Sequence, residues 1–417
     1  MHLSLLTKVR SMFSVSHPPK LKSILIASGL IISLAMGVRH GFGFWLQPIS
    51  QAHNWTRETY SMAMAIQNIM WGLFGPLAGI AADKLGVARI VLIGAALYVA
   101  GLLCMSLVDQ PTLFIISTGV LIGAALSCTA FGPLSGIVGR STTVSERSWA
   151  FGILGAAGSF GQFVMIPAEQ QLIALTNWQD ALQLLAVAIL IVMLPMAFLL
   201  REPPHVISPH QHQQSLTEAI REAFSHRSFR LLICGYFVCG FQVVFIGVHL
   251  PAYLKDAGLA DPNIAVMALA LIGLFNIFGS FYAGKLGGTV PKRYLLSGIY
   301  FARAVFILIF ILAPLSAFSV YVFAAFMGLL WLSTVPLTNG VIAGIFGVRH
   351  LSMLSGFVFF SHQLGSFLGV WLGGYLYTLE GNYNTVWLIT IGLGIFAGCI
   401  NLPINEEPIS RQAPSLA

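Results

Sequence analysis

Charged residues are scarce in this sequence. Asp, Glu, Lys and Arg make up 8% of the 417 residues, whereas 57% are hydrophobic. A water-soluble protein typically carries about three times that share of charged side chains. The shortage excludes a soluble globular protein and indicates an integral membrane protein.

Motifs for metal binding, nucleotide hydrolysis and covalent catalysis are also missing. The five cysteines form no CxxC pair, zinc spacing or disulfide framework, and all fall within apolar runs, where thiols act as small packing groups. No phosphate-cradling glycine loop is present, so we expect no ATP hydrolysis by the chain itself. Without a metal cluster or a nucleophile–base pair, we expect neither a metal, nor a cofactor, nor an enzyme.

Long apolar runs recur along the whole chain. A membrane-spanning helix needs roughly 20 such residues, and twelve segments of the sequence meet that length. The predicted spans are 22–48, 57–81, 87–108, 111–139, 147–173, 178–200, 229–256, 264–286, 293–313, 317–345, 351–378 and 384–404. The sequence therefore predicts an all-α membrane protein with twelve transmembrane helices, held in the lipid bilayer.

One longer polar segment divides the predicted spans six to six. Residues 201–228 contain the Pro- and Gln-rich stretch REPPHVISPHQHQQ and the amphipathic stretch SLTEAIREAF, which together indicate a cytoplasmic linker. We expect two pseudo-symmetric six-helix bundles, over 22–200 and 229–404. Residues 1–21 and 405–417 are the expected terminal segments. The basic first segment leads into a span without a small-residue cleavage site, so we expect no signal peptide.

Basic residues collect on one side of the predicted topology. If the N-terminus is cytoplasmic, 17 of the 21 Lys and Arg residues fall on the cytoplasmic side and only Arg57 and Lys255 fall outside. The positive-inside rule therefore predicts that both termini are cytoplasmic. The net charge of +7 reflects this topology, and we expect no nucleic-acid partner. The two remaining basic residues, Arg39 and Arg303, lie in mid-span.

The loop after the second span contains a recognisable motif. The stretch GIAADKLGVAR resembles the G-x-x-x-D-[RK]-x-G-x-[RK]-[RK] signature of the major facilitator superfamily at Gly79, Asp83, Lys84, Gly86 and Arg89. The resemblance implies a twelve-helix secondary transporter whose gate at the cytoplasmic face uses these residues, and we add Arg140 as a candidate gating residue. A weaker copy in the second half, GSFYAGKLGGTVPKR, has Gly284 where the acid would be.

A finer resemblance covers most of the chain. The stretches HNWTRETYS, FGILGAAGSFGQ and SHQLGSFLGVWLGG are similar to the monocarboxylate transporter and oxalate/formate antiporter branch of that superfamily. The resemblance implies a basic residue of span 1 near His40, and an Asp and an Arg in span 8. Asn276 and Ser280 stand at those two positions here, so the chain departs from the pattern.

Arg39 is the strongest candidate for a substrate-binding residue. An arginine at mid-span costs about 2.5–3.5 kcal/mol to insert and normally faces a wet cavity or a partner. The acids lie in loops or near span ends, with Glu169 the deepest, so an anionic substrate would supply the missing charge. The guanidinium fork suits a carboxylate. The alternative is packing against backbone carbonyls at a break made by Gly37, Gly41 and Gly43.

Other polar and aromatic residues of the spans are weaker candidates for the pocket. In span 7, Gln242, Phe245 and His249 share a face that would bind substrate. The remaining predicted substrate-binding residues are His40, Phe44, Thr129, Phe131, Asn276, Trp331, Thr334, Asn339, His362 and Gln363. Interhelical hydrogen bonding is an alternative for each polar member of this set. For Arg303, on an outer helix, we favour a structural contact.

The predicted function is the transport of small organic anions, monocarboxylates above all, by alternating access between the two halves. Proton symport is the expected coupling, through His40, His249 or His362 or, failing these, through Glu169 or by co-transport of the proton as the substrate acid. We assign the glycines of spans 5 and 11, including Gly152, Gly365, Gly369 and Gly373, to a rocking interface between the halves. Alternatives are an exporter of amphipathic or drug-like compounds and a membrane sensor without transport. We expect a monomer in the inner (plasma) membrane of a bacterium.

Overall fold

In the computed structural model, residues 21–55, 57–201, 214–259 and 261–410 are described. These residues form helices without any strand, and twelve spans are long and apolar enough to cross a membrane. The uninterrupted spans are α2 (Leu21–Gly41), α4 (Arg57–Leu85), α5 (Val87–Leu107), α9 (Val144–Leu175), α10 (Trp178–Leu199), α12 (Arg227–Asp256), α13 (Pro262–Leu286), α14 (Lys292–Leu312), α17 (Leu351–Glu380) and α18 (Asn384–Asn401). This confirms the predicted all-α membrane fold.

Two spans that the sequence analysis treated as continuous are broken. Span 4 consists of α6 (Pro111–Ile115), the π-helical η2 (Ile116–Leu121), α7 (Ile122–Thr129) and α8 (Phe131–Ser141). Span 10 consists of α15 (Ala317–Leu330) and α16 (Thr334–Phe346). Each break precedes a proline by a few residues, Pro133 or Pro336. In a continuous helix the proline ring would clash with the carbonyl four residues earlier, which favours a break near these two positions.

Span 1, predicted as continuous over 22–48, is also interrupted. The helix α2 stops at Gly41, a 3-10 turn η1 (Phe42–Trp45) follows, and a second short helix α3 (Leu46–His53) comes after it. The Tyr60 hydroxyl donates a hydrogen bond to the Phe42 carbonyl at this break. The freed backbone group is therefore satisfied by a neighbouring helix, as the membrane interior requires.

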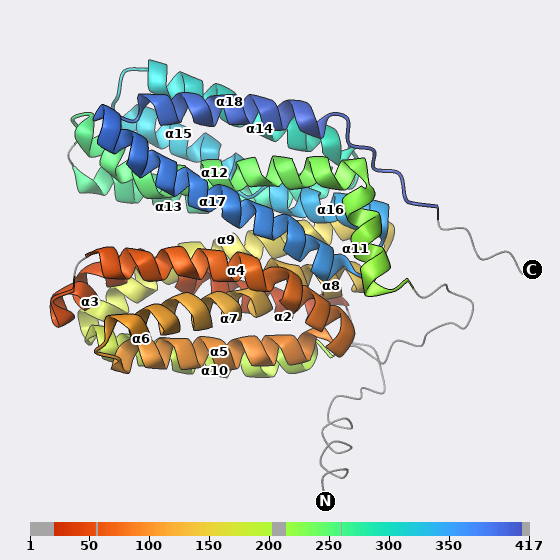
Figure 1. The fold of residues 1–417 in the computed structure, drawn as a ribbon, viewed down its shortest axis with the longest axis horizontal. Coiled ribbons are helices and arrows are strands. Elements are labelled where there is room, and N and C mark those ends of the chain that lie inside the picture. The colour runs from red at the N-terminus through yellow and green to blue at the C-terminus, as the bar shows by residue number, and fades with distance from the viewer. Residues whose placement is uncertain (1–20, 56, 202–213, 260, 411–417) are drawn as a thin grey trace, which may run out of the picture.

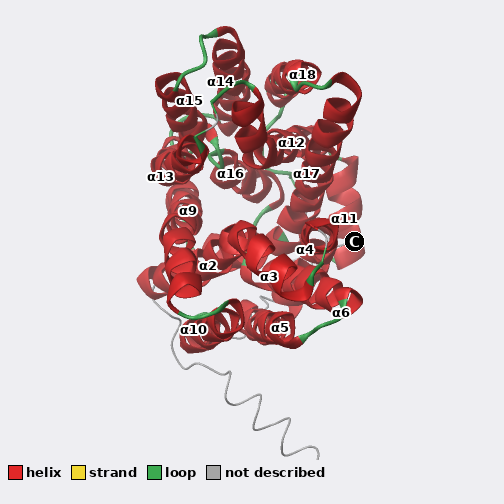
Figure 2. Cartoon of the chain, turned by 90° about the vertical axis from the view of Figure 1, so that its left-hand side faces the viewer, coloured by secondary structure: helices red, strands yellow, loops and turns green. Residues whose placement is uncertain are grey.

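The helices form two groups that lie one above the other (Figure 1). Helices α2–α10 pack mainly among themselves, and so do α12–α18. Two seams join the groups, α4 with α17 on one side and α9 with α13 on the other. Figure 2, a view along the helices, shows these seams on either side of a central region. The short α11 (Leu216–Ser225) lies across one end of the bundle, which we call the linker end (Figure 1).

Glycines allow close approach at both seams. Gly75 of α4 faces Gly356 of α17, and Gly152 of α9 faces Gly284 of α13. The three glycines of span 11 that we assigned to this interface, Gly365, Gly369 and Gly373, are placed differently from the prediction. Added methyl groups at Gly365, Gly369 and Gly373 would meet α12 within the second group of helices, so this stripe tightens one half and does not form the interface between halves.

Candidate substrate-binding site

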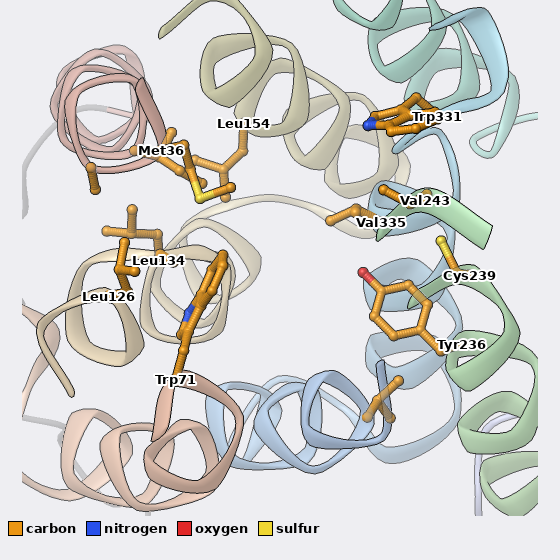
Figure 3. Close-up of a cluster of buried hydrophobic side chains, with 14 of the residues drawn as sticks. Met36, Trp71, Leu126, Leu134, Leu154, Tyr236, Cys239, Val243, Trp331 and Val335 are labelled. Carbon is orange, nitrogen blue, oxygen red and sulfur yellow. The ribbon is translucent and has the colours of Figure 1, made fainter. Parts of the chain in front are cut away.

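The centre of the molecule, between the two seams, is lined mainly by apolar and aromatic side chains (Figure 3). From the first group of helices these include Met36, Trp71, Leu126, Leu134 and Leu154, and from the second Tyr236, Cys239, Val243, Trp331 and Val335. A small cavity of about 20 Å³ lies between Trp71, Phe131 and Phe359, which is room for about one water molecule. Of the predicted residues, Phe131 and Trp331 are therefore placed at the centre.

Arg39 lies two residues before the end of α2 and points toward α4. One guanidinium nitrogen, Nη2, donates to the Asn68 Oδ1 at 2.6 Å, and the group lies 5.6 Å from the centre of the Trp71 ring. Its Nε is buried and has no hydrogen-bond partner among the described residues. No described carboxylate forms an ion pair with Arg39. The guanidinium is thus held by a neutral amide and an aromatic face, with its charge uncompensated.

His40 and Phe44 do not extend this arrangement. The His40 Nδ1 lies 2.6 Å from the Met36 carbonyl oxygen, four residues back on the same helix, which is the structural alternative for a mid-span histidine. The side chain of Phe44 lies outside the described residues.

Several candidates of the second half lie around a buried cluster beside the centre. The Thr334 hydroxyl and the Cys239 thiol are 3.3 Å apart. The His362 ring is stacked on Phe359 and lies 5.1 Å from the Tyr236 ring, centre to centre. In Figure 3 the Tyr236 hydroxyl points toward the central region. Tyr236 and the nearby Trp71 were not predicted, because one aromatic residue among many in an apolar span carries no distinguishing pattern.

Arg303 has the structural contacts that we favoured for it. It is completely buried, and its guanidinium donates to the carbonyl oxygens of Leu330 and Trp331 at the break of span 10. It also donates to the Gln242 Oε1 at 3.3 Å. Arg303 therefore satisfies the backbone carbonyls that the broken helix leaves free.

The face formed by Gln242, Phe245 and His249 does not line the centre, contrary to the prediction. The Gln242 Nε2 donates to the Thr390 carbonyl of α18, and Phe245 packs edge-on against Trp387. The His249 Nε2 lies 3.0 Å from the Val370 carbonyl oxygen of α17. The three side chains pack within the second half. Thr129 is similarly displaced: it packs against Gly94 of α5, and its hydroxyl donates to the Ala125 carbonyl.

Three predicted pocket residues instead join the two groups of helices. The Asn276 Nδ2 donates to the Ser159 hydroxyl at 2.8 Å, and the Asn339 Nδ2 donates to the Ser135 hydroxyl at 3.0 Å. The Gln363 Nε2 donates to the Asn68 carbonyl at 3.2 Å. In this conformation their amides form polar bridges between the halves.

The predicted gate residues lie at the linker end. The Asp83 carboxylate accepts a hydrogen bond from Arg140 at 2.8 Å and another from the Met353 backbone N–H, across the α4–α17 seam, at 3.1 Å. Met353 is in the first turn of α17, where free N–H groups attract an anion. A methyl group on Gly79 would press on the backbone of Ser352 and Met353. Asp83 thus connects the halves at a point of close helix approach.

The other residues of the motif shape the turn between α4 and α5. Gly86 has a φ of 88°, a conformation that favours glycine. Lys84 is exposed beside it, and Arg89 is in the first turn of α5. These positions suit a tight connection at the membrane face.

Comparison with known proteins agrees with this geometry. The family model described as Major Facilitator Superfamily matches residues 25–340. The chain belongs to the major facilitator superfamily. A solved structure of the E. coli fucose:proton symporter FucP superposes with a TM-score of 0.70 at 17% identity, covering 91% of this chain and 98% of that chain.

Two curated relatives have similar length. The chain is 26% identical to the uncharacterized MFS-type transporter YcxA of Bacillus subtilis, over 91% of this chain and 93% of the relative. It is also 26% identical to monocarboxylate transporter 13 of Rattus norvegicus, over 92% of this chain and 91% of the relative. The protein is therefore a multi-pass membrane transporter of this superfamily.

Proposed function

We propose that the protein transports small organic anions, with monocarboxylates as the substrate class, and that Arg39 binds the substrate carboxylate. The observation that carries the proposal is the uncompensated guanidinium of Arg39, beside Trp71 at the centre of the molecule. A bidentate carboxylate contact would use the donors that Asn68 leaves free. The name of monocarboxylate transporter 13 supports this substrate class.

The transport cycle we propose alternates access between bundles 22–200 and 229–404. The described hydrogen bonds between the two groups extend from Asn68 toward the linker end, where Asp83 and Met353 meet. With both termini and the linker in the cytoplasm, as the distribution of basic residues predicts, the structure corresponds to a state closed toward the cytoplasm. Proton symport would supply the driving force for accumulation.

Counterflow in proteoliposomes tests this function. Vesicles containing the purified protein are loaded with one unlabelled carboxylate at a time, and entry of the same labelled anion is measured. We expect transient accumulation with at least one monocarboxylate and none with its methyl ester or amide, because these carry no negative charge for Arg39. Exchange of neutral amphipathic compounds without exchange of any anion would contradict the proposal and favour an exporter of such compounds.

A further inference from the structure

Glu169 is a completely buried acid on α9, away from the centre of the molecule. Its Oε2 accepts a hydrogen bond from the Trp45 indole Nε1 at 2.8 Å. Its Oε1 is buried and has no hydrogen-bond partner among the described residues. No described cation forms an ion pair with this carboxyl group. Among the described residues, the neutral indole N–H of Trp45 is therefore the only hydrogen-bond partner of this carboxyl group.

The surroundings of Glu169 belong to the break in span 1. A methyl group on Gly41 would collide with the carboxyl group, so Glu169 packs directly against the end of α2. The titratable groups that face it are the phenols of Tyr60 on α4 and Tyr98 on α5, both of which interact with it electrostatically. Tyr98 also interacts electrostatically with Arg39, with the opposite sign. The His40 ring is turned to the Met36 carbonyl, so it does not neutralise the acid.

An ionised carboxylate is very unfavourable in such a place. Burying a charge inside a membrane protein is costly unless a counter-charge or several hydrogen bonds compensate it. Glu169 has neither, and an ionisable group that persists there under this cost usually serves ion or substrate movement. In the described conformation the stable form is the neutral acid, which holds a proton.

We propose that Glu169 is the proton-binding site that couples proton movement to anion transport. This rests on the proposed function and names its coupling residue. Deprotonation would place a negative charge beside the end of α2, the helix that carries Arg39, where it disfavours a substrate carboxylate bound to that arginine. A bound anion therefore favours the protonated acid, and by linkage the proton favours anion binding. Anion and proton are carried together.

The histidines are poorer candidates by geometry. A ring nitrogen of His40 lies against a backbone carbonyl, and so does one of His249. The His362 Nδ1 lies 3.2 Å from the Gln363 Oε1, and its ring is stacked on Phe359. These contacts hold the three rings in helix packing.

Glu169→Gln tests the coupling, because the amide resembles the protonated acid and still accepts a hydrogen bond from Trp45. We expect anion counterflow to persist, while accumulation driven by an imposed pH gradient and the accompanying proton uptake fall by about tenfold or more. Asp180→Asn is the matched control, since Asp180 is an exposed acid at the same end of the first half and should behave as wild type. Accumulation and proton uptake at the wild-type level in Glu169→Gln would overturn the proposal.

A second measurement tests whether Glu169 holds a proton in the resting protein and does not require a known substrate. Infrared difference spectra of the purified wild type against Glu169→Gln at neutral pH should show the carbonyl band of a protonated carboxylic acid. Its absence would mean an ionised Glu169 and would refute the proposal even if anions are transported. Conversely, a wild-type protein that exchanges no anion but shows this band would contradict the proposed function and leave the proton site standing. Trp45→Phe, which removes the anchoring hydrogen bond together with part of a buried ring, should keep proton-driven accumulation.

Discussion

At the scale of single residues, the two mid-span arginines have contrasting environments. Arg303 is saturated by the carbonyls of Leu330 and Trp331 and by Gln242. Arg39 has one neutral partner, Asn68, and an unpartnered Nε. A cation whose donors are all used stabilises the fold, whereas a cation with free donors beside the central region is available to a ligand.

Replacing Arg303 should therefore affect stability. Arg303→Gln leaves carbonyl groups of the span 10 break without a donor, at a cost of about 1–3 kcal/mol for each. We expect a clearly lowered melting temperature in detergent, partly restored in Arg303→Lys. Arg221→Gln, on the exposed face of α11, is the control and should melt like the wild type. An unchanged melting temperature for Arg303→Gln would show that the buried guanidinium is not needed for the fold.

Arg39 could be selected from sequence because acids are so scarce near mid-span that a buried arginine there stands out. The sequence did not reveal whether Gln242 and His249 face the centre of the molecule. Their spacing places them on one face of a helix, but α12 is apolar on almost every side, so the pattern does not say which side faces the centre. Trp71 and Tyr236 were missed for the same reason. Contacts between helices distant in sequence decide these orientations.

At the scale of elements, hydropathy predicted all twelve spans, with ends close to those observed except for the end of span 1, which was predicted at 48 and lies at Gly41. Hydropathy did not predict the breaks in spans 1, 4 and 10, because the hydropathy of an apolar run is the same whether or not its helix is interrupted. Pro133 and Pro336 each stand just after a break, but Pro76, Pro167, Pro195 and Pro251 lie inside uninterrupted helices, so a proline alone does not locate a break. The Asn276, Asn339 and Gln363 bridges were unpredictable because each joins residues from different halves.

The α9–α13 seam yields a prediction at this scale. A methyl group at Gly284 would overlap the Gly152 backbone, so Gly284→Ala should push the two helices apart at the linker end. We expect slower counterflow and faster alkylation of a cysteine placed at the buried seam position Ser280, in a background without the native cysteines. Gly298→Ala is the control, because no atom lies within 4 Å of a methyl group added there. Equal alkylation rates in Gly284→Ala and the control would argue against a tight seam.

At the scale of the whole molecule, the two groups of helices are held together at the linker end. Asp83 joins α4 to α8 through Arg140 and to α17 through the Met353 N–H. A contact that exists only when this end is closed stabilises the closed state alone. The motif predicted the acid at this end of the second span. The structure places Asp83 in the last turn of α4 and not in a loop, and its backbone partner across the seam became visible only in the folded chain.

Asp83→Asn should therefore change the balance between conformations more than the binding site. We expect a fall in the rate of counterflow with little change in the affinity for the anion, because the residues near Arg39 are untouched. Transport rates and binding affinity measured on the same preparation separate the two effects. Asp180→Asn again serves as the control for loss of an acid. A mutant with wild-type rates would show that Asp83 does not gate transport.

The central claim is that Arg39 binds the substrate carboxylate, and affinity measured together with melting temperature tests it most directly. The anion that gives the strongest counterflow is titrated into purified wild type, Arg39→Lys and Arg39→Gln. Losing a charge-assisted hydrogen bond costs about 1.5–3 kcal/mol, so Arg39→Gln should bind roughly ten- to a hundredfold more weakly, with Arg39→Lys in between. The melting temperature of Arg39→Gln without ligand should stay close to that of the wild type. Stable Arg39→Gln protein that binds the anion with unchanged affinity would contradict the account.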